Sequence, residues 1–334
     1  MRAAAVQLAP VPFALEANLA AAEAAVRAAA AQGAQLVVLP ACFNTGYVYS
    51  PRLTAAAEPP AGLSLQRLTA LSAELNIYLA AAAVRRQGRE VVMVAVLVTP
   101  DGCLTTAAQR RLGPWEAAYF APGAGPLVAD TALGRLGLLV GWDFTDPAAW
   151  AALAGRVDAV VLPAAPVRLH RAVLNFPAAR KVHLAELMPA LLPRRAALDD
   201  LASGYLGQAA AALGAPVIHA GLAGRFVAQL PCPRRSFLAA ALTRPRYWAW
   251  VTAAPQVSLR ATFYAASAVY ATDGRAITAP LLDAGLALAD LTAPPAPAQP
   301  PRAVPPAPIP AQARFAAALL RPALRHAYAT HRAP

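Results

Sequence analysis

The sequence predicts an α/β protein with one large domain and a proline-rich C-terminal arm. Three observations predict it. Short apolar runs alternate with longer alanine- and leucine-rich segments of helical character. The apolar runs are mostly four to eight residues long, the length of buried strands. Glycine, proline and aspartate stand between these segments and indicate turns.

The first half of the chain reads as strand, helix, strand, helix and a strand pair. Gly33 ends the first helix, because glycine readily takes the left-handed conformation beyond a helix end. Pro100-Asp101-Gly102 forms the turn after the last strand of this half. The predicted elements are a strand at Ala3–Leu8, a helix at Leu15–Gln32, a strand at Leu36–Leu39, a helix near Leu65–Leu75 and paired strands at Ile77–Val84 and Val91–Thr99.

The second half has weaker signals. Leu136–Val140 and Ala159–Leu162 are short apolar runs typical of buried strands. Residues 177–213 read as a helical region interrupted by prolines, with its last helix at about 205–213 and a strand at 216–220. Ser267–Ala271 reads as a further strand. Residues 164–180 and 221–262 carry no pattern that we can interpret.

The C-terminal segment differs from the rest of the chain in composition, since it is rich in proline. Residues 1–291 form the predicted domain, 292–312 a proline-rich linker, and 313–334 a C-terminal helix. Proline lacks the backbone donor and fixes φ, so the linker is expected to form neither helix nor sheet. The apolar positions of the last segment, with Pro322 as a kink, predict a helix docked on the domain or on a second subunit.

The net charge of +12 comes almost entirely from arginine, since Lys181 is the sole lysine. The arginines occur as separate pairs, and no nucleic-acid-binding motif accompanies them. This pattern favours a solvated basic surface over nucleic-acid binding.

The remaining composition predicts a cytoplasmic protein without metal or cofactor. Cys42, Cys103 and Cys232 show no metal or redox spacing, and a low, odd cysteine count suits a reducing compartment. The N-terminus becomes polar too quickly for a signal peptide. Residues 201–224 are uncharged, but their glycines, Pro216 and polar side chains favour a helix and a strand over a membrane span.

One motif indicates a family. Residues 36–47 read Leu-Val-Val-Leu-Pro-Ala-Cys-Phe-Asn-Thr-Gly-Tyr, an apolar strand followed by Pro40 and a loop that ends at Gly46-Tyr47. This stretch resembles the first signature of the nitrilase superfamily, the carbon–nitrogen hydrolases. In that family the residue after the proline is the catalytic glutamate, and here it is Ala41.

A second neighbourhood resembles the region that carries the family's lysine and a second glutamate. It begins at Gln109-Arg110-Arg111-Leu112 and continues through Glu116 and Tyr119 to Pro122-Gly123. Glu116 matches the second glutamate, whereas Gln109 stands in the lysine position. Arg110 or Arg111 could supply positive charge, although a planar guanidinium substitutes poorly for an ammonium group.

A third neighbourhood resembles the region of the nucleophile. The strand Leu136–Val140 leads into Gly141-Trp142-Asp143-Phe144-Thr145-Asp146-Pro147. Trp142, Asp143 and Pro147 match the family, and Gly141 replaces the cysteine. With later matches near residues 157–163 and 263–274, the resemblance covers about residues 1–290.

Cys42 is poorly placed to replace the lost nucleophile. Successive side chains on extended backbone point to opposite faces, so Cys42 is expected to face away from the pocket if Ala41 faces it. No neighbouring histidine or lysine is evident that would lower its pKa.

The resemblance implies an α-β-β-α sandwich, a homodimer, and a pocket that includes Glu116, Trp142, Asp143, Tyr47, Tyr119 and Arg111. Replacement of base, cation and nucleophile by Ala41, Gln109 and Gly141 predicts a catalytically silent member. We expect its pocket to be enlarged and to bind a small amide, carboxylate or amine, or the protein to regulate a partner. The alternatives are an active amidase or nitrilase with a displaced site, and a scaffold that uses its basic surface and proline-rich arm.

Overall fold

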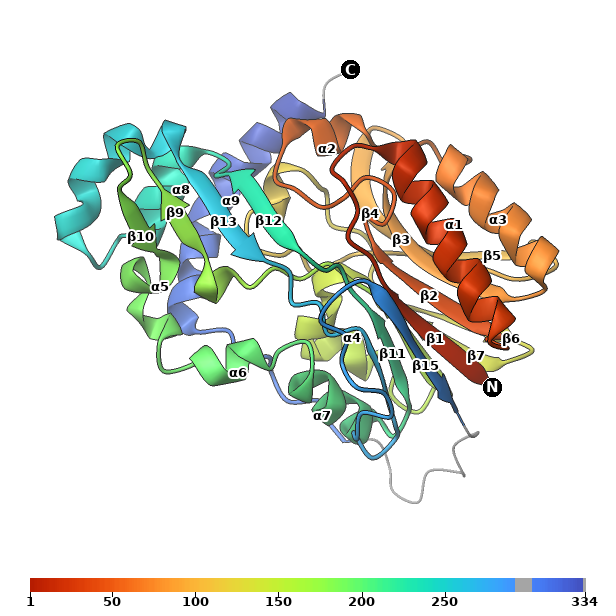
Figure 1. Cartoon of the computed structure of the whole chain (residues 1–334). Coiled ribbons are helices and arrows are strands. Elements are labelled where there is room, and N and C mark those ends of the chain that lie inside the picture. Colours follow the sequence, from red (N-terminus) through yellow and green to blue (C-terminus); the bar gives the residue numbers. More distant parts are fainter. Residues whose placement is uncertain (292–301, 333–334) are drawn as a thin grey trace.

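The computed structural model describes residues 1–291 and 302–332. Two sheets form the centre of the molecule (Figure 1). The first has six strands in the order β15-β1-β2-β3-β4-β5. Its strands are β15 (Gly285–Asp290), β1 (Arg2–Gln7), β2 (Leu36–Ala41), β3 (Tyr78–Gln87), β4 (Glu90–Val98) and β5 (Leu104–Ala108).

The second sheet has five strands in the order β14-β11-β8-β7-β6, of which β7, β8 and β11 run parallel. Its strands are β14 (Ala268–Tyr270), β11 (Val217–Ala220), β8 (Ala159–Pro163), β7 (Gly134–Leu138) and β6 (Leu127–Thr131). The two sheets pack face to face, and β1 and β2 lie against β11 and β8.

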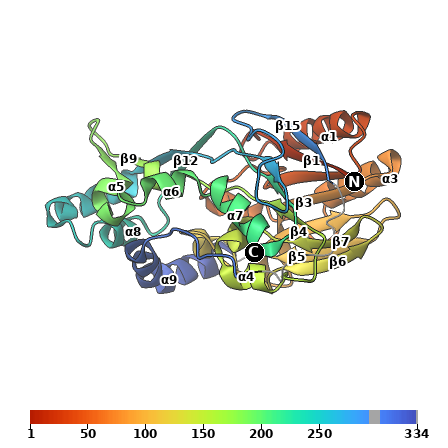
Figure 2. The same ribbon diagram turned by 90° about the horizontal axis from the view of Figure 1, so that it is seen from below.

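Helices cover both outer faces, so the expected α-β-β-α sandwich is confirmed. Figure 2 shows the layers from below. Helices α1 (Leu15–Ala31) and α3 (Leu63–Leu75) lie on the six-stranded sheet, and α4 (Pro147–Ala151) and α7 (Gly204–Leu213) lie on the five-stranded sheet. Strands β2 and β8 are buried along their whole length. This explains why they read as continuous apolar runs rather than as alternating ones.

A third, smaller sheet extends the sandwich at the left of Figure 1, in the order β10-β9-β13-β12. The prediction of helix throughout 177–213 was partly wrong, because Lys181–His183 is a strand that pairs with Val173–Asn175. Such short strands depend on their partner for stability, so no local signal predicts them. The extension contains β9 (Val173–Asn175), β10 (Lys181–His183), β12 (Arg225–Gln229), β13 (Ser258–Thr262), α5 (Leu184–Leu187), α6 (Arg195–Asp199), α8 (Pro233–Ala240) and the 3-10 segments η3 (Leu169–Arg171), η4 (Pro189–Leu191) and η5 (Pro245–Gln256).

The C-terminal helix α9 (Ala311–His331) docks on its own chain, against α8 and the turn η1 (Glu116–Ala118). It continues through Pro322. The hydroxyl of Tyr328 donates to Glu90 Oε2 at 2.7 Å and accepts from the backbone N–H of Val91 at 2.7 Å. Residues 302–310 before the helix form neither helix nor strand, but α9 begins at Ala311, inside the 292–312 range predicted as linker; residues 292–301 lie outside the described residues.

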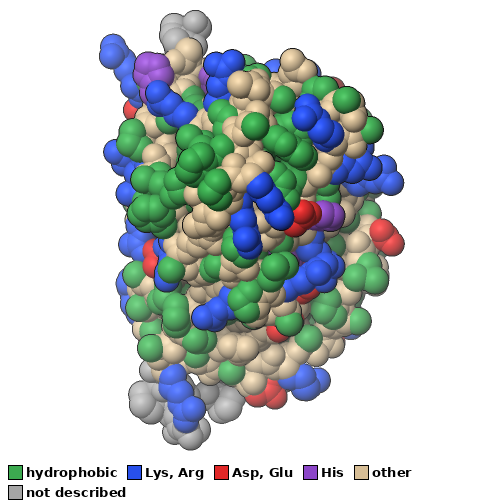
Figure 3. Space-filling model, turned by 90° about the vertical axis from the view of Figure 1, so that its left-hand side faces the viewer, with side chains coloured by type: hydrophobic (Ala, Val, Ile, Leu, Met, Phe, Trp, Pro, Cys, Tyr) green, Lys and Arg blue, Asp and Glu red, His purple; other side chains and the backbone are tan. Residues whose placement is uncertain are grey.

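The basic side chains are dispersed over the visible surface, as the sequence pattern predicted. On the face shown in Figure 3, lysine and arginine side chains are scattered among apolar ones and do not gather into a stripe. Within residues 1–291 and 302–332, no helix is both long and apolar enough to cross a membrane.

Candidate functional site

The residues predicted to match the family's site lie at or beyond the ends of strands β2, β5 and β7. Ala41 is the last residue of β2, Gln109 follows β5, and Gly141 begins the 3-10 turn η2 (Gly141–Thr145) after β7. Glu116 begins η1. The fold thus brings Gln109, Glu116 and Gly141 together from loops that are separate in the sequence.

Glu116 lies at the centre of this region and is only 2% exposed. Its Oε1 accepts a hydrogen bond from the hydroxyl of Tyr47 at 2.6 Å. Its Oε2 accepts from Gln109 Nε2 and from the backbone N–H of Gly113, both at 2.7 Å. Burial raises the pKa of Glu116, and these three hydrogen bonds oppose the rise.

Gln109 is held in one orientation. Its Nε2 also donates to the carbonyl oxygen of Arg111 at 2.8 Å, and because both partners are acceptors, the nitrogen must face them. Its Oε1 is buried without a partner among the described residues. A Cβ built on Gly141 would lie 2.2 Å from this oxygen, and Gly141 has a φ of +52°. The side chain of Gln109 therefore occupies the space that a side chain at position 141 would need.

The expected enlargement of the pocket around Glu116 was wrong. Gln109 is 0% exposed, Ala41 is 1% exposed and Tyr47 is 5% exposed, so almost no surface here is open to a water-sized probe. The physical reason is that the side chain of Gln109 fills the space beside Gly141, while its amide group bonds Glu116.

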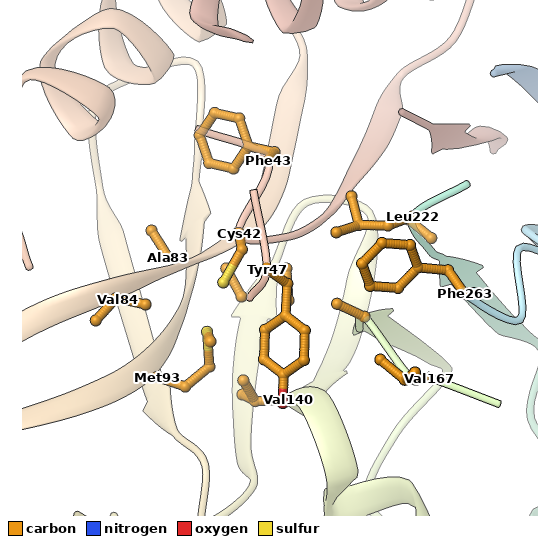
Figure 4. Close-up of a cluster of buried hydrophobic side chains, with 14 of the residues drawn as sticks. Cys42, Phe43, Tyr47, Ala83, Val84, Met93, Val140, Val167, Leu222 and Phe263 are labelled. Atoms are coloured by element: carbon orange, nitrogen blue, oxygen red, sulfur yellow. The ribbon is translucent and has the colours of Figure 1, made fainter. Parts of the chain in front are cut away.

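Aromatic side chains close the site on the side of Tyr47. The ring of Tyr47 lies 6.0 Å from that of Phe226 and 6.4 Å from that of Phe263. Figure 4 shows Tyr47 among apolar side chains that include Val140, Val167 and Phe263. We did not predict Phe226 and Phe263 as site residues. Burial alternates along β12 in the structure, but the three consecutive apolar residues Phe226, Val227 and Ala228 gave no matching alternation in the sequence.

Asp143 accepts hydrogen bonds from the backbone of the loop after β5. Its Oδ1 accepts the backbone N–H groups of Arg110 at 3.0 Å and of Arg111 at 2.6 Å. Burial raises the pKa of Asp143 to about 7, although these hydrogen bonds favour the charged form. Asp143 thus positions the loop that holds Gln109 and Glu116.

The other predicted pocket residues pack without bonding the carboxylate. Trp142 lies against Gly113, where an added Cβ would be 2.2 Å from the indole nitrogen. Arg111 bonds through its backbone, and the guanidinium of Arg110 pairs with Asp146 at 3.0 Å. Tyr119 stacks on Tyr49 at 5.9 Å and on His331 of α9 at 5.5 Å. Among the described residues, the hydrogen-bond partners of Glu116 therefore include no cationic side chain.

Cys42 is next to the site but is chemically protected. It is 0% exposed, has a φ of +56°, and its thiol lies among Ala83, Val84 and Met93 (Figure 4). Burial raises the pKa of this thiol, so the thiolate is strongly disfavoured. Across the described ranges, no group of three or more His, Cys, Asp or Glu side chains is arranged to hold a metal ion.

Comparison with known proteins gives consistent similarities. The family model described as carbon–nitrogen hydrolase matches residues 2–175. A nitrilase of Pyrococcus abyssi is 31% identical over 170 residues, which are 49% of this chain and 64% of that protein. The chain therefore matches less than two thirds of the length of that relative.

Solved structures of a Nesterenkonia amidase share the fold. A cysteine-to-serine mutant of this amidase of the nitrilase superfamily superposes with a TM-score of 0.60 at 22% identity, covering 88% of this chain and 92% of the other. A double mutant of the same amidase in complex with acrylamide gives a TM-score of 0.60 at 22% identity, covering 87% and 90%.

Proposed function

Because the chain belongs to the carbon–nitrogen hydrolase family, we propose that it is a non-hydrolytic member that acts by binding or by regulating a partner. Cysteine-dependent hydrolysis of an amide or nitrile requires a thiolate, a base that activates it and a cation or donor for the developing oxyanion. Ala41 and Gly141 supply neither the base nor the thiolate at the family's positions, and Gln109 carries no charge and uses its Nε2 to bond Arg111 and Glu116. Loss of even one such group commonly costs several orders of magnitude in rate.

The contact between Gln109 and Gly141 carries the proposal. The residue in the cation position extends into the space of the missing nucleophile, so the two replacements are complementary in shape. The carboxamide of Gln109 is itself an amide, and its nitrogen bonds Glu116 at 2.7 Å. An external amide would have to displace this internal one.

The closed arrangement around Glu116 favours a function carried by surfaces outside the family's site. Uptake of a small amide at Glu116 requires the separation of the bonds from Tyr47, Gln109 and Gly113. Regulation of a partner requires no such opening. A homodimer or a pair with an active relative would suit this role, and both remain predictions, as does a cytoplasmic location.

Release of ammonia from a panel of amides and nitriles tests the proposal. We expect no release above a buffer control by the natural protein. Ala41→Glu, Gln109→Lys and Gly141→Cys are introduced together to restore the family's groups. The change at 109 must accompany the change at 141, because Gln109 blocks a side chain there.

Two outcomes distinguish the alternatives. Hydrolysis by the natural protein that is lost in Cys42→Ser would overturn the proposal and establish a displaced site. Hydrolysis by the triple variant alone would support it, since the fold would then need only the missing groups.

A further inference from the structure

A second cavity lies outside the family's site. It has a volume of about 110 Å³ and is bounded by α9, by the 184–201 segment of the extension and by Trp115 and Trp142 of the site loops. Ala41, Gln109, Glu116 and Gly141 are not among its lining residues. The cavity therefore adjoins the sealed site without opening into it, since Trp115 precedes Glu116 and the predicted pocket residue Trp142 follows Gly141.

The cavity exists because small side chains face it from the C-terminal helix. Ala313, Ala316 and Ala317 line it from α9, and Ala240 lines it from α8. Leucines and Met188 form most of the opposite wall. A row of alanines opposite larger side chains therefore leaves a hollow, partly open to solvent, that a ligand can fill.

The polar side chains in the wall already have partners. The hydroxyl of Tyr264 donates to the carbonyl oxygen of Leu198 at 2.5 Å. His170 Nε2 lies 2.8 Å from Asp199 Oδ1, and burial lowers the pKa of His170, which favours the neutral ring. Ser236 Oγ donates to the carbonyl oxygen of Pro231. The wall thus offers dispersion contacts and little for a charged ligand to bind.

Trp115 contributes apolar ring surface to the wall. Its indole N–H is buried without an acceptor among the described residues and is not exposed at the cavity surface. Enclosed apolar cavities of roughly 150 Å³ bind benzene in other proteins. The cavity under α9 has a similar apolar lining and is somewhat smaller, and it is partly open to solvent.

We propose that the cavity under α9 is a binding site for an uncharged apolar molecule, such as a single ring or a short alkyl chain. The site is formed jointly by the C-terminal helix and the extension, and most of its lining lies beyond residue 175, outside the segment that matches the family model. The proposal does not depend on whether the chain hydrolyses amides.

Benzene tests the site, with binding followed by calorimetry and by the thermal midpoint of the full chain. We expect saturable binding, and an increase in the midpoint of about 2 °C at a tenfold excess over Kd. Acetamide, which is small and polar, is expected to bind at least tenfold more weakly. Absence of saturable benzene binding, or equal binding of acetamide, would overturn the proposal.

Substitutions on α9 locate the site. Ala316→Leu places a larger side chain in the cavity and is expected to weaken benzene binding tenfold or more. Ala318→Leu is the matched control, because Ala318 is exposed on the same helix and does not line the cavity. Equal weakening by both variants would place the benzene elsewhere.

A third variant covers the case in which Ala316→Leu does not fold. Leu320→Ala enlarges the cavity and is expected to admit naphthalene, which the natural protein is expected to bind at least tenfold more weakly. Failure of this variant to gain naphthalene binding would contradict the assignment.

Discussion

Substitution of Gly141 by alanine should destabilise the protein through two separable effects. The backbone at 141 has a φ of +52°, and an L-residue in this left-handed region costs about 1–2 kcal/mol. The new Cβ would also lie 2.2 Å from Gln109 Oε1, and overpacking of this kind costs about 1–3 kcal/mol. We therefore expect Gly141→Ala to lower the free energy of unfolding by about 2–5 kcal/mol.

Removal of Gln109 should relieve the second effect only. Gln109→Ala alone is expected to destabilise, because Glu116 loses a buried donor, a loss of about 1.5–3 kcal/mol where the acceptor is charged. In the Gln109→Ala background, Gly141→Ala should cost only the backbone strain. The double mutant should therefore be about 1–3 kcal/mol more stable than the sum of the single effects predicts.

Urea unfolding of the natural protein and the three variants measures this coupling. Gly102→Ala is a control for backbone strain alone, because Gly102 has a φ of +82° and a Cβ there would meet nothing within 4 Å. Additivity of the two substitutions to within about 0.5 kcal/mol would refute the contact between Gln109 and position 141. The observation that carries the proposed function would then be lost.

Three further predictions concern Asp143, Tyr328 and Cys42. Burial raises the pKa of Asp143 to about 7, whereas an aspartate in the unfolded chain titrates near 4. Between these pH values the folded state holds a proton that the unfolded state has lost. The free energy of unfolding therefore falls as pH rises through this range. From pH 5 to pH 7 this group should contribute a decrease of about 2–3 kcal/mol in urea unfolding, which Asp143→Asn should abolish; equal pH slopes would contradict it. Tyr328→Phe leaves the buried N–H of Val91 without its 2.7 Å partner and should cost about 1–3 kcal/mol, whereas Thr330→Ala on the exposed side of the same helix should change stability little. Iodoacetamide should alkylate exposed Cys103 first and buried Cys42 only after denaturation, as read by mass spectrometry; rapid labelling of native Cys42 would indicate an activated thiol.

The alternation of strands and helices was predictable because its signals are local, whereas the α-β-β-α sandwich was implied by the family resemblance. The strands β2 and β8 are apolar along their length, and Gly33 follows the first helix with a φ of +81°. Residue type and spacing encode such local features. The spacing of apolar residues likewise predicted a C-terminal helix at 313–334, and the structure has a helix at Ala311–His331.

The extension was not predictable on the same basis. Strands β9 and β10 have three residues each, and their pairing depends on residues that are distant in sequence. Phe226 and Phe263 reach Tyr47 from this part of the chain, so their role in closing the site had no local signal.

The sequence by itself determined which side chains stand at positions 41, 109 and 141, and the family resemblance predicts that these are the positions of the base, cation and nucleophile. Sequence reasoning then expected an enlarged pocket, since the side chains had become smaller or neutral. Only the tertiary structure decided that Gln109 fills the space beside Gly141 and that alanines of α9 leave a cavity elsewhere. The physical reason is that the size of a pocket depends on which side chains from separate loops and helices pack against each other. Residue type alone does not specify that packing.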